Sequence, residues 1–131
     1  MRSLYPFLFF IVLATQPAFA HAILIDGAPA SSATVPPGPL SVRLRFNSRI
    51  DADRSRLTLV ALSAKPNAMP NILRQTPPET PNLLEAQTSV VAGSWVLRWQ
   101  VLAVDGHITR GEVPFTVAEP AATAPHVASK P

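Results

Sequence analysis

The sequence has 131 residues but no cysteine, few aromatic side chains and few charges. Without cysteine there can be no disulfide and no thiolate metal site, so a hydrophobic core must stabilise the fold. The length suits one domain, which is large enough to bury such a core. Removal of Arg2 with the first twenty residues would leave a net charge of +2. So small and scattered an excess predicts no nucleic-acid partner.

Long apolar runs are also missing, except at the N-terminus. There Arg2 precedes an apolar run from Leu4 to Ala14, and Ala18-Phe19-Ala20 follows. This order is typical of a signal peptide with a small-x-small cleavage site. The run has about half the length of a membrane-spanning helix, which disfavours the alternative of a signal anchor. We expect residues 1–20 to be a signal helix that is cleaved after Ala20, and the mature protein to be exported and soluble.

Helical periodicity is lacking after this segment, and alternation takes its place. "LSVRLRF" (40–46) and "SWVLRWQVLAV" (94–104) alternate apolar and polar residues, as half-buried strands do. The same alternation places Trp95 and Trp99 in the core, rather than as stacking platforms. Further strands are expected at 22–25, 56–62, 82–86 and 112–117. Short strands at this spacing predict an all-β sandwich or barrel.

Proline is abundant, and it marks the irregular parts of the chain. Residues 63–81 contain five prolines and predict a long loop, with one short helical turn near 71–74. Pro114 cannot donate a ladder hydrogen bond, so its strand should lie at an edge or contain a bulge. The Ala/Pro-rich residues 119–131 predict a disordered tail, which leaves residues 21–118 as the folded domain.

Candidate metal ligands are few, because the chain has three histidines. Of these, His126 lies in the tail. Cleavage after Ala20 would make His21 the first residue, so that its amine and its imidazole Nδ1 could chelate one metal ion. Asp105 stands two residues before His107, and in an extended chain both side chains point the same way. Three nitrogens and one oxygen in a tetragonal arrangement suit Cu(II) better than zinc.

The D-x-H pattern alone also has a simpler interpretation. Asp105 could cap a turn or orient a surface His107 without any metal. Gly106, between them, could mark a bend that spoils the alignment of the two side chains. The N-terminal histidine favours a metal site over this simpler interpretation.

Two stretches carry a family resemblance: "HAILIDGAPASSATVPPGPLSVRLRF" and "WQVLAVDGHITRGEVPFTV". From His21 to about Val117 the chain resembles the CopC family of bacterial periplasmic copper-binding proteins. The resemblance implies a cupredoxin- or immunoglobulin-like Greek-key β-fold and a periplasmic location. It also implies one Cu(II) per chain, with His21, Asp105 and His107 as the metal ligands.

The chain departs from the family pattern in two places that concern copper. Asn47-Ser48 follows the "LSVRLRF" strand where some members have a glutamate ligand. Some members also have a methionine-rich loop, but residues 63–81 contain only Met69. A single thioether does not make a cage for Cu(I), so we expect no dedicated Cu(I) site.

These observations predict a monomeric periplasmic Cu(II)-binding protein of copper homeostasis or resistance, and not an enzyme. It would sequester copper or deliver it to a membrane partner such as an inner-membrane copper importer. Two alternatives remain at this point. One is a copper redox enzyme, because oxygenases also use an N-terminal histidine brace. The other is a structural exported β-sandwich module in which the histidines are incidental.

Overall fold

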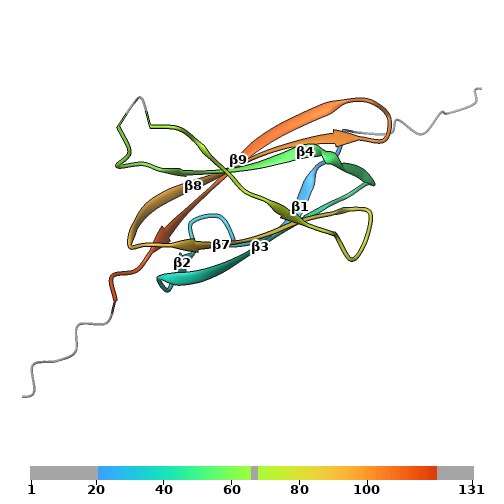
Figure 1. Cartoon of the computed structure of the whole chain (residues 1–131). Coiled ribbons are helices and arrows are strands. Elements are labelled where there is room, and N and C mark those ends of the chain that lie inside the picture. The colour runs from blue at the N-terminus through green and yellow to red at the C-terminus, as the bar shows by residue number, and fades with distance from the viewer. Residues whose placement is uncertain (1–20, 66–67, 121–131) are drawn as a thin grey trace, which may run out of the picture.

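The computed structural model describes residues 21–65 and 68–120, and these residues form a sandwich of two β-sheets (Figure 1). The strands are β1 (Leu24–Ala28), β2 (Thr34–Val35), β3 (Gly38–Phe46), β4 (Ile50–Ala61), β5 (Asn71–Ile72), β6 (Gln75–Thr76), β7 (Leu83–Val90), β8 (Gly93–Ala103) and β9 (Ile108–Val117). The predicted signal peptide and residues 121–131 of the predicted tail lie outside the described residues. Within the described part, no helix is long and apolar enough to cross a membrane.

One sheet has the strand order β1-β3-β7-β6, and the other has the order β2-β9-β8-β4-β5. We call them sheet A and sheet B. Nearly all neighbouring strands are antiparallel; the exception is the short pair of β2 with β9. The all-β prediction is therefore confirmed, and of the two forms expected the chain adopts the sandwich.

The core lies between the sheets, where β3 and β8 contribute alternate residues. The inward side chains of β3 are all buried, as predicted: Leu40, Val42, Leu44 and Phe46. Trp99 of β8 packs edge-on against Phe46, with ring centroids 5.1 Å apart. Its indole also lies against Gly111 of β9, where a Cβ atom would collide with the ring. Trp95 is only partly buried, and its indole N–H donates to the carbonyl of Val91.

The predicted helical turn near 71–74 is wrong. Asn71 and Ile72 instead form β5, which pairs with β4 in sheet B. The chain then crosses to sheet A, where β6 pairs with β7. The buried side chain of Leu73 fixes this crossing, and its N–H donates to the carbonyl of Leu57. Burial of one leucine and pairing to both sheets therefore prevail over a local pattern that suited a turn of helix.

Strand β4 starts at Ile50, six residues before the predicted start. Its register against β8 shifts between Asp51 and Arg56, which marks an irregularity of the bulge type. Ser55 stabilises this bulge: its hydroxyl donates to the carbonyl of Asp51 and accepts from the N–H of Leu102. The bulge breaks the alternation of side chains, which is why the sequence pattern did not show the first half of the strand.

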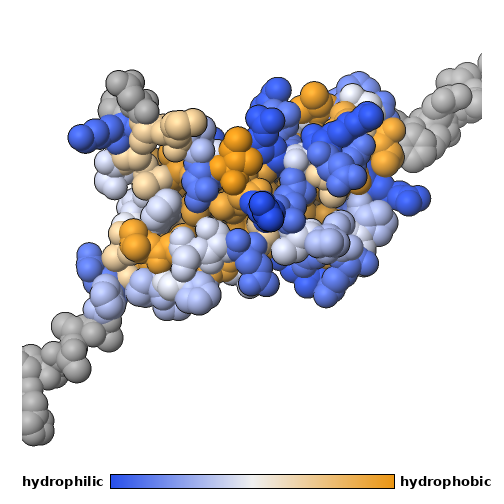
Figure 2. Space-filling model, viewed as in Figure 1, coloured by the Kyte–Doolittle hydropathy of each residue, from blue (hydrophilic) through white to orange (hydrophobic). Residues whose placement is uncertain are grey.

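Pro114 lies on β9, whose outer side is paired only at Thr116 and Val117 by β2. The carbonyl of Pro114 accepts a hydrogen bond from the N–H of Ser32. The strand is thus nearly an edge strand, and the proline stands where few ladder hydrogen bonds are made. Figure 2 shows the outer surface from the same side as Figure 1; hydrophilic side chains cover most of it, with hydrophobic ones between them.

Candidate metal-binding site

The first described residues are held at one end of the sandwich. Ala22 is fully buried and anchors the segment in the core. The N–H of Ile23 donates to Asn47 Oδ1 over 2.8 Å, and the N–H of Asn47 donates back to the carbonyl of Ile23 over 2.9 Å. Because Asn47 begins the β3–β4 turn, this pair of hydrogen bonds fixes the N-terminal segment to that turn. His21 itself is exposed.

The β8–β9 hairpin lies beside this turn, since the N–H of Val104 donates to the carbonyl of Arg49. Its loop is tight: the N–H of Gly106 donates to the carbonyl of Ala103, and the N–H of Ala103 donates to that of His107. Gly106 has a φ of +88°, a left-handed conformation that favours glycine. Residues 104–106 therefore form a three-residue hairpin loop whose third residue, Gly106, is left-handed, as is common for loops of this length.

Within this loop Asp105 and His107 are in direct contact. Asp105 Oδ1 accepts the backbone N–H of His107 over 3.0 Å, and Oδ2 lies 3.1 Å from His107 Nδ1. The backbone hydrogen bond is the main reason why the pKa of Asp105 lies below its usual value. Attraction to the His107 and His21 imidazoles lowers this pKa further, while partial burial opposes the shift. Asp105 is therefore ionised at neutral pH.

This contact does not arise as the sequence suggested. An extended chain was expected to align Asp105 with His107, but the segment is a turn in which Gly106 makes the bend. The carboxylate is brought to the imidazole because it caps this turn. The contacts of Asp105 are thus those expected from the simpler interpretation, in which it caps the turn and orients the histidine.

His21 and His107 lie side by side although they are far apart in the sequence. Their ring centroids are 4.7 Å apart and the rings meet edge-on, at an interplanar angle of 75°. Among the described residues, no three His, Cys, Asp or Glu side chains form a ready-made metal site. The structure therefore brings His21 to His107 and His107 to Asp105, without closing the three into one ligand cage. His126 lies outside the described residues.

Sequence reasoning missed one residue at this site. It treated Asn47 only as an absent oxygen ligand, whereas its side chain tethers the segment that begins with His21. The turn-forming pair Asn47-Ser48 was the available signal, because asparagine side chains often accept backbone N–H groups at turns. Met69 lies at the other end of β4, where its side chain is 92% exposed.

The family model described as "CopC domain" matches residues 24–118, which is most of the chain. The chain belongs to the CopC family, and the resemblance seen in the sequence is confirmed.

Several relatives are similar over most of their length. Protein YobA of Escherichia coli strain K12 is 26% identical over 105 residues, which are 80% of this chain and 85% of YobA. The crystal structure of CopC from Methylosinus trichosporium OB3b is 26% identical, with a TM-score of 0.64 over 76% of this chain and 95% of that one. PcoC from Escherichia coli, described as a methionine-rich copper resistance protein, is 23% identical with a TM-score of 0.56. It is matched over its whole length and over 76% of this chain, and this likeness supports the fold.

Proposed function

We propose that this protein is an exported Cu(II)-binding protein in which His21 and His107 bind the metal ion. The main observation behind this proposal is the contact of the two imidazoles across 4.7 Å at one end of the sandwich. Both residues are exposed, so this contact lies outside the core and within reach of a metal ion. Membership of the CopC family and the copper resistance described for PcoC support copper as the metal.

The ligand set follows from the chemistry of the residues. Cleavage after Ala20 would free the His21 amine, which can chelate Cu(II) together with the Nδ1 of the same residue. Because His107 Nδ1 faces Asp105, its Nε2 is the nitrogen left for the metal. Nitrogen-rich, tetragonal sites of this kind suit Cu(II). These ligands together form one site, which would bind one copper ion per chain.

Asp105 has one of two roles, as a metal ligand or as a residue that orients His107. As a ligand it would rotate away from His107 Nδ1 and give an oxygen to copper. As an orienting residue it would keep its 3.1 Å contact and hold His107 with Nε2 toward the metal. The second role resembles the carboxylate–histidine–metal arrangement of many metal proteins.

The site suits binding and release of copper. The His107 side chain is 60% exposed, so a bound ion would lie at the surface, within reach of a partner that accepts it. We therefore propose that the protein sequesters copper in the periplasm or passes it to a partner in the inner membrane, acting as a monomer. Membership of the CopC family confirms the prediction that the protein is not an enzyme, which contradicts the redox-enzyme alternative.

The test compares two proteins that differ only before His21. One begins at His21 with a free amine, and the other has a glycine in front of it, which turns this amine into an amide. Changes around metal ligands alone cost about 10–100-fold in affinity, so loss of a ligand nitrogen should cost more than about 100-fold. Cu(II) titration, followed by EPR and visible absorption, measures this difference.

The outcomes separate the parts of the proposal. Equal Cu(II) affinity of both proteins would contradict the role of the amine. Absence of a stoichiometric Cu(II) signal from the protein that begins at His21 would contradict copper binding as a whole and favour the structural module. The mass of the mature N-terminus on exported protein would check cleavage after Ala20.

A further inference from the structure

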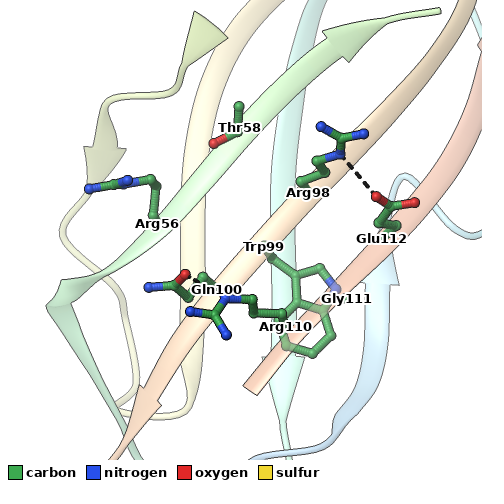
Figure 3. Close-up of a pocket in the computed structure, with 8 residues that line it drawn as sticks. All are labelled: Arg56, Thr58, Arg98, Trp99, Gln100, Arg110, Gly111 and Glu112. Carbon is green, nitrogen blue, oxygen red and sulfur yellow. Dashed lines mark hydrogen bonds and ion pairs between the residues drawn. The ribbon is translucent and has the colours of Figure 1, made fainter. Parts of the chain in front are cut away.

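The outward face of sheet B contains a hollow that the proposed copper site does not use. Its volume is about 360 Å³, and it lies over β4, β8 and β9 (Figure 3). The outward side chains form two rows across these strands. One row is Arg56, Gln100 and Arg110, and the other is Thr58, Arg98 and Glu112.

The charge of this hollow is unbalanced. Arg98 is paired with Glu112, since its Nε lies 2.9 Å from Glu112 Oε1. Arg110 Nε donates instead to the neutral Gln100 over 2.8 Å (Figure 3). Within the described part of the chain, neither Arg56 nor Arg110 has a carboxylate within ion-pair distance. Three guanidinium groups and one carboxylate leave the hollow with a charge of +2.

The arginines on the outward face of sheet A differ in this respect. Arg43 lies within ion-pair distance of both Glu79 and Glu85, and Arg45 within that of Asp26. The chain therefore neutralises its arginines on one sheet and leaves two of them without a carboxylate on the other. The hollow of sheet B offers mainly hydrogen-bond donors. Positively charged donors of this kind bind anionic acceptors, and the anionic acceptors that a protein segment supplies are carboxylates.

We propose that this hollow docks an acidic segment of the protein that exchanges copper with this one. A segment fits better than a free small anion, because the hollow is open and Arg98 is 57% exposed, whereas small-ligand sites bury most of their ligand. Arg110 follows His107 by three residues, or roughly 10 Å of strand. A partner anchored on Arg110 would thus reach the proposed metal ligands. The identity of the partner rests on the proposed function, but the recognition of acidic side chains does not.

The experiment measures binding of a fluorescein-labelled hexaglutamate peptide to the protein that begins at His21, with and without Cu(II), by fluorescence anisotropy at low ionic strength. The test variant is Arg56→Gln/Arg110→Gln. The matched control is Arg43→Gln/Arg45→Gln, which removes the same charge from the other sheet. Loss of two charge-assisted hydrogen bonds should weaken binding about tenfold or more in the test variant. The control should stay within about twofold, since its arginines already have partners.

A third variant is expected to act in the opposite direction. Glu112→Gln removes the carboxylate of the hollow and frees Arg98, so the peptide should bind more tightly. Amide chemical shifts give an independent location: those of Gln100 and Arg110 should move with peptide, and those of Arg43 should not. Arg56→Gln/Arg110→Gln should bind Cu(II) as the unaltered protein does. Failure of the copper proposal would instead appear as absent Cu(II) binding in the unaltered protein, so the two failures can be distinguished.

Three results would overturn the inference. Equal weakening by both double variants would show attraction to net charge alone. An unchanged affinity in Arg56→Gln/Arg110→Gln would show that the peptide binds elsewhere. Displacement of the peptide by an equal concentration of citrate would assign the hollow to free small anions instead of a protein segment.

Discussion

The two ends of the sandwich are built differently. At one end lie the start of the described chain, the β3–β4 turn and the tight β8–β9 hairpin, which meet beside His21 and His107 (Figure 1). At the other end β4 runs into the connection to β5, where the described hydrogen bonds are mostly local, such as Ala64 to Ala61 and Ala68 to Lys65. Met69 extends from this connection into solvent.

The difference between the two ends shows where metal ligands can be held in position before the metal ion binds. Ligands bind tightly when their geometry is fixed before the metal arrives. At the histidine end, the buried Ala22 and hydrogen bonds across segments fix the backbone. The methionine end lies one strand away, roughly 35 Å along the twelve residues of β4, so its thioether cannot join the histidines. Copper binding should therefore depend on one end alone.

The largest effect should come from loss of a histidine. His107→Ala and His21→Ala each remove an imidazole from the same site, and each should lower Cu(II) affinity by more than about 100-fold. Titration with EPR detection measures both. A histidine variant that kept full affinity would place the copper elsewhere on the chain and would contradict the difference between the two ends.

Asp105→Asn should have a smaller effect, of about tenfold on affinity. The amide keeps an oxygen for the His107 N–H but loses the negative charge beside Nδ1. If Asp105 is a ligand, the EPR and visible spectra of Cu(II) should change; if it orients His107, affinity should fall with little spectral change.

The pH dependence gives a further check on Asp105. Because its pKa lies below the usual value, the carboxylate stays ionised as the pH falls through the mildly acidic range. Loss of copper in that range should then come from protonation of the nitrogen ligands. Asp105→Asn should move the midpoint of this loss to higher pH, because the variant binds copper more weakly, but should leave its steepness unchanged, because Asp105 takes up no proton in this range. A less steep loss in the variant would contradict this explanation.

The sequence predicted most of the fold because the strands alternate cleanly. The inward residues of β3 were identified in full, and those of β8 nearly so, since Trp95 is only partly buried. The errors fall where non-local contacts decide the structure. The bulge around Ser55 hides the start of β4, and the pairing of Asn71 with β4 replaces the expected helical turn.

The candidate site could be predicted in composition but not in geometry. His21, Asp105 and His107 were selected for their chemistry, and the contact of the two imidazoles depends on a turn that brings distant segments together. The sequence could not show that Asp105 would cap the hairpin loop. It also could not show that Asn47 would tether the N-terminal segment, because that hydrogen bond joins residues 24 positions apart.

Asn47→Ala should loosen the histidine end of the sandwich without removing a proposed metal ligand. Loss of the 2.8 Å hydrogen bond to the Ile23 N–H should cost about 1 kcal/mol of stability. Cu(II) affinity should fall only a few-fold, because the buried Ala22 still anchors the segment. Urea unfolding and copper titration measure the two effects.

Asn71→Ala is the matched control, since Asn71 makes no side-chain hydrogen bond with the described residues. An equal loss in both variants would show that the tether does not matter.

The smallest effect is expected at the methionine end. Met69→Leu removes the thioether but keeps an apolar side chain of similar size at a position that is 92% exposed. Neither stability nor Cu(II) affinity should change measurably, because the residue packs against little and lies a strand length from the histidines. One thioether alone should also give no tight Cu(I) site, since soft metal ions need several sulfur ligands. Titration of the reduced protein with Cu(I) against a competing chelator tests this point. Tight Cu(I) binding that Met69→Leu abolished would show that both ends bind copper. The two ends would then differ in the oxidation state that they bind, Cu(II) at the histidines and Cu(I) at Met69.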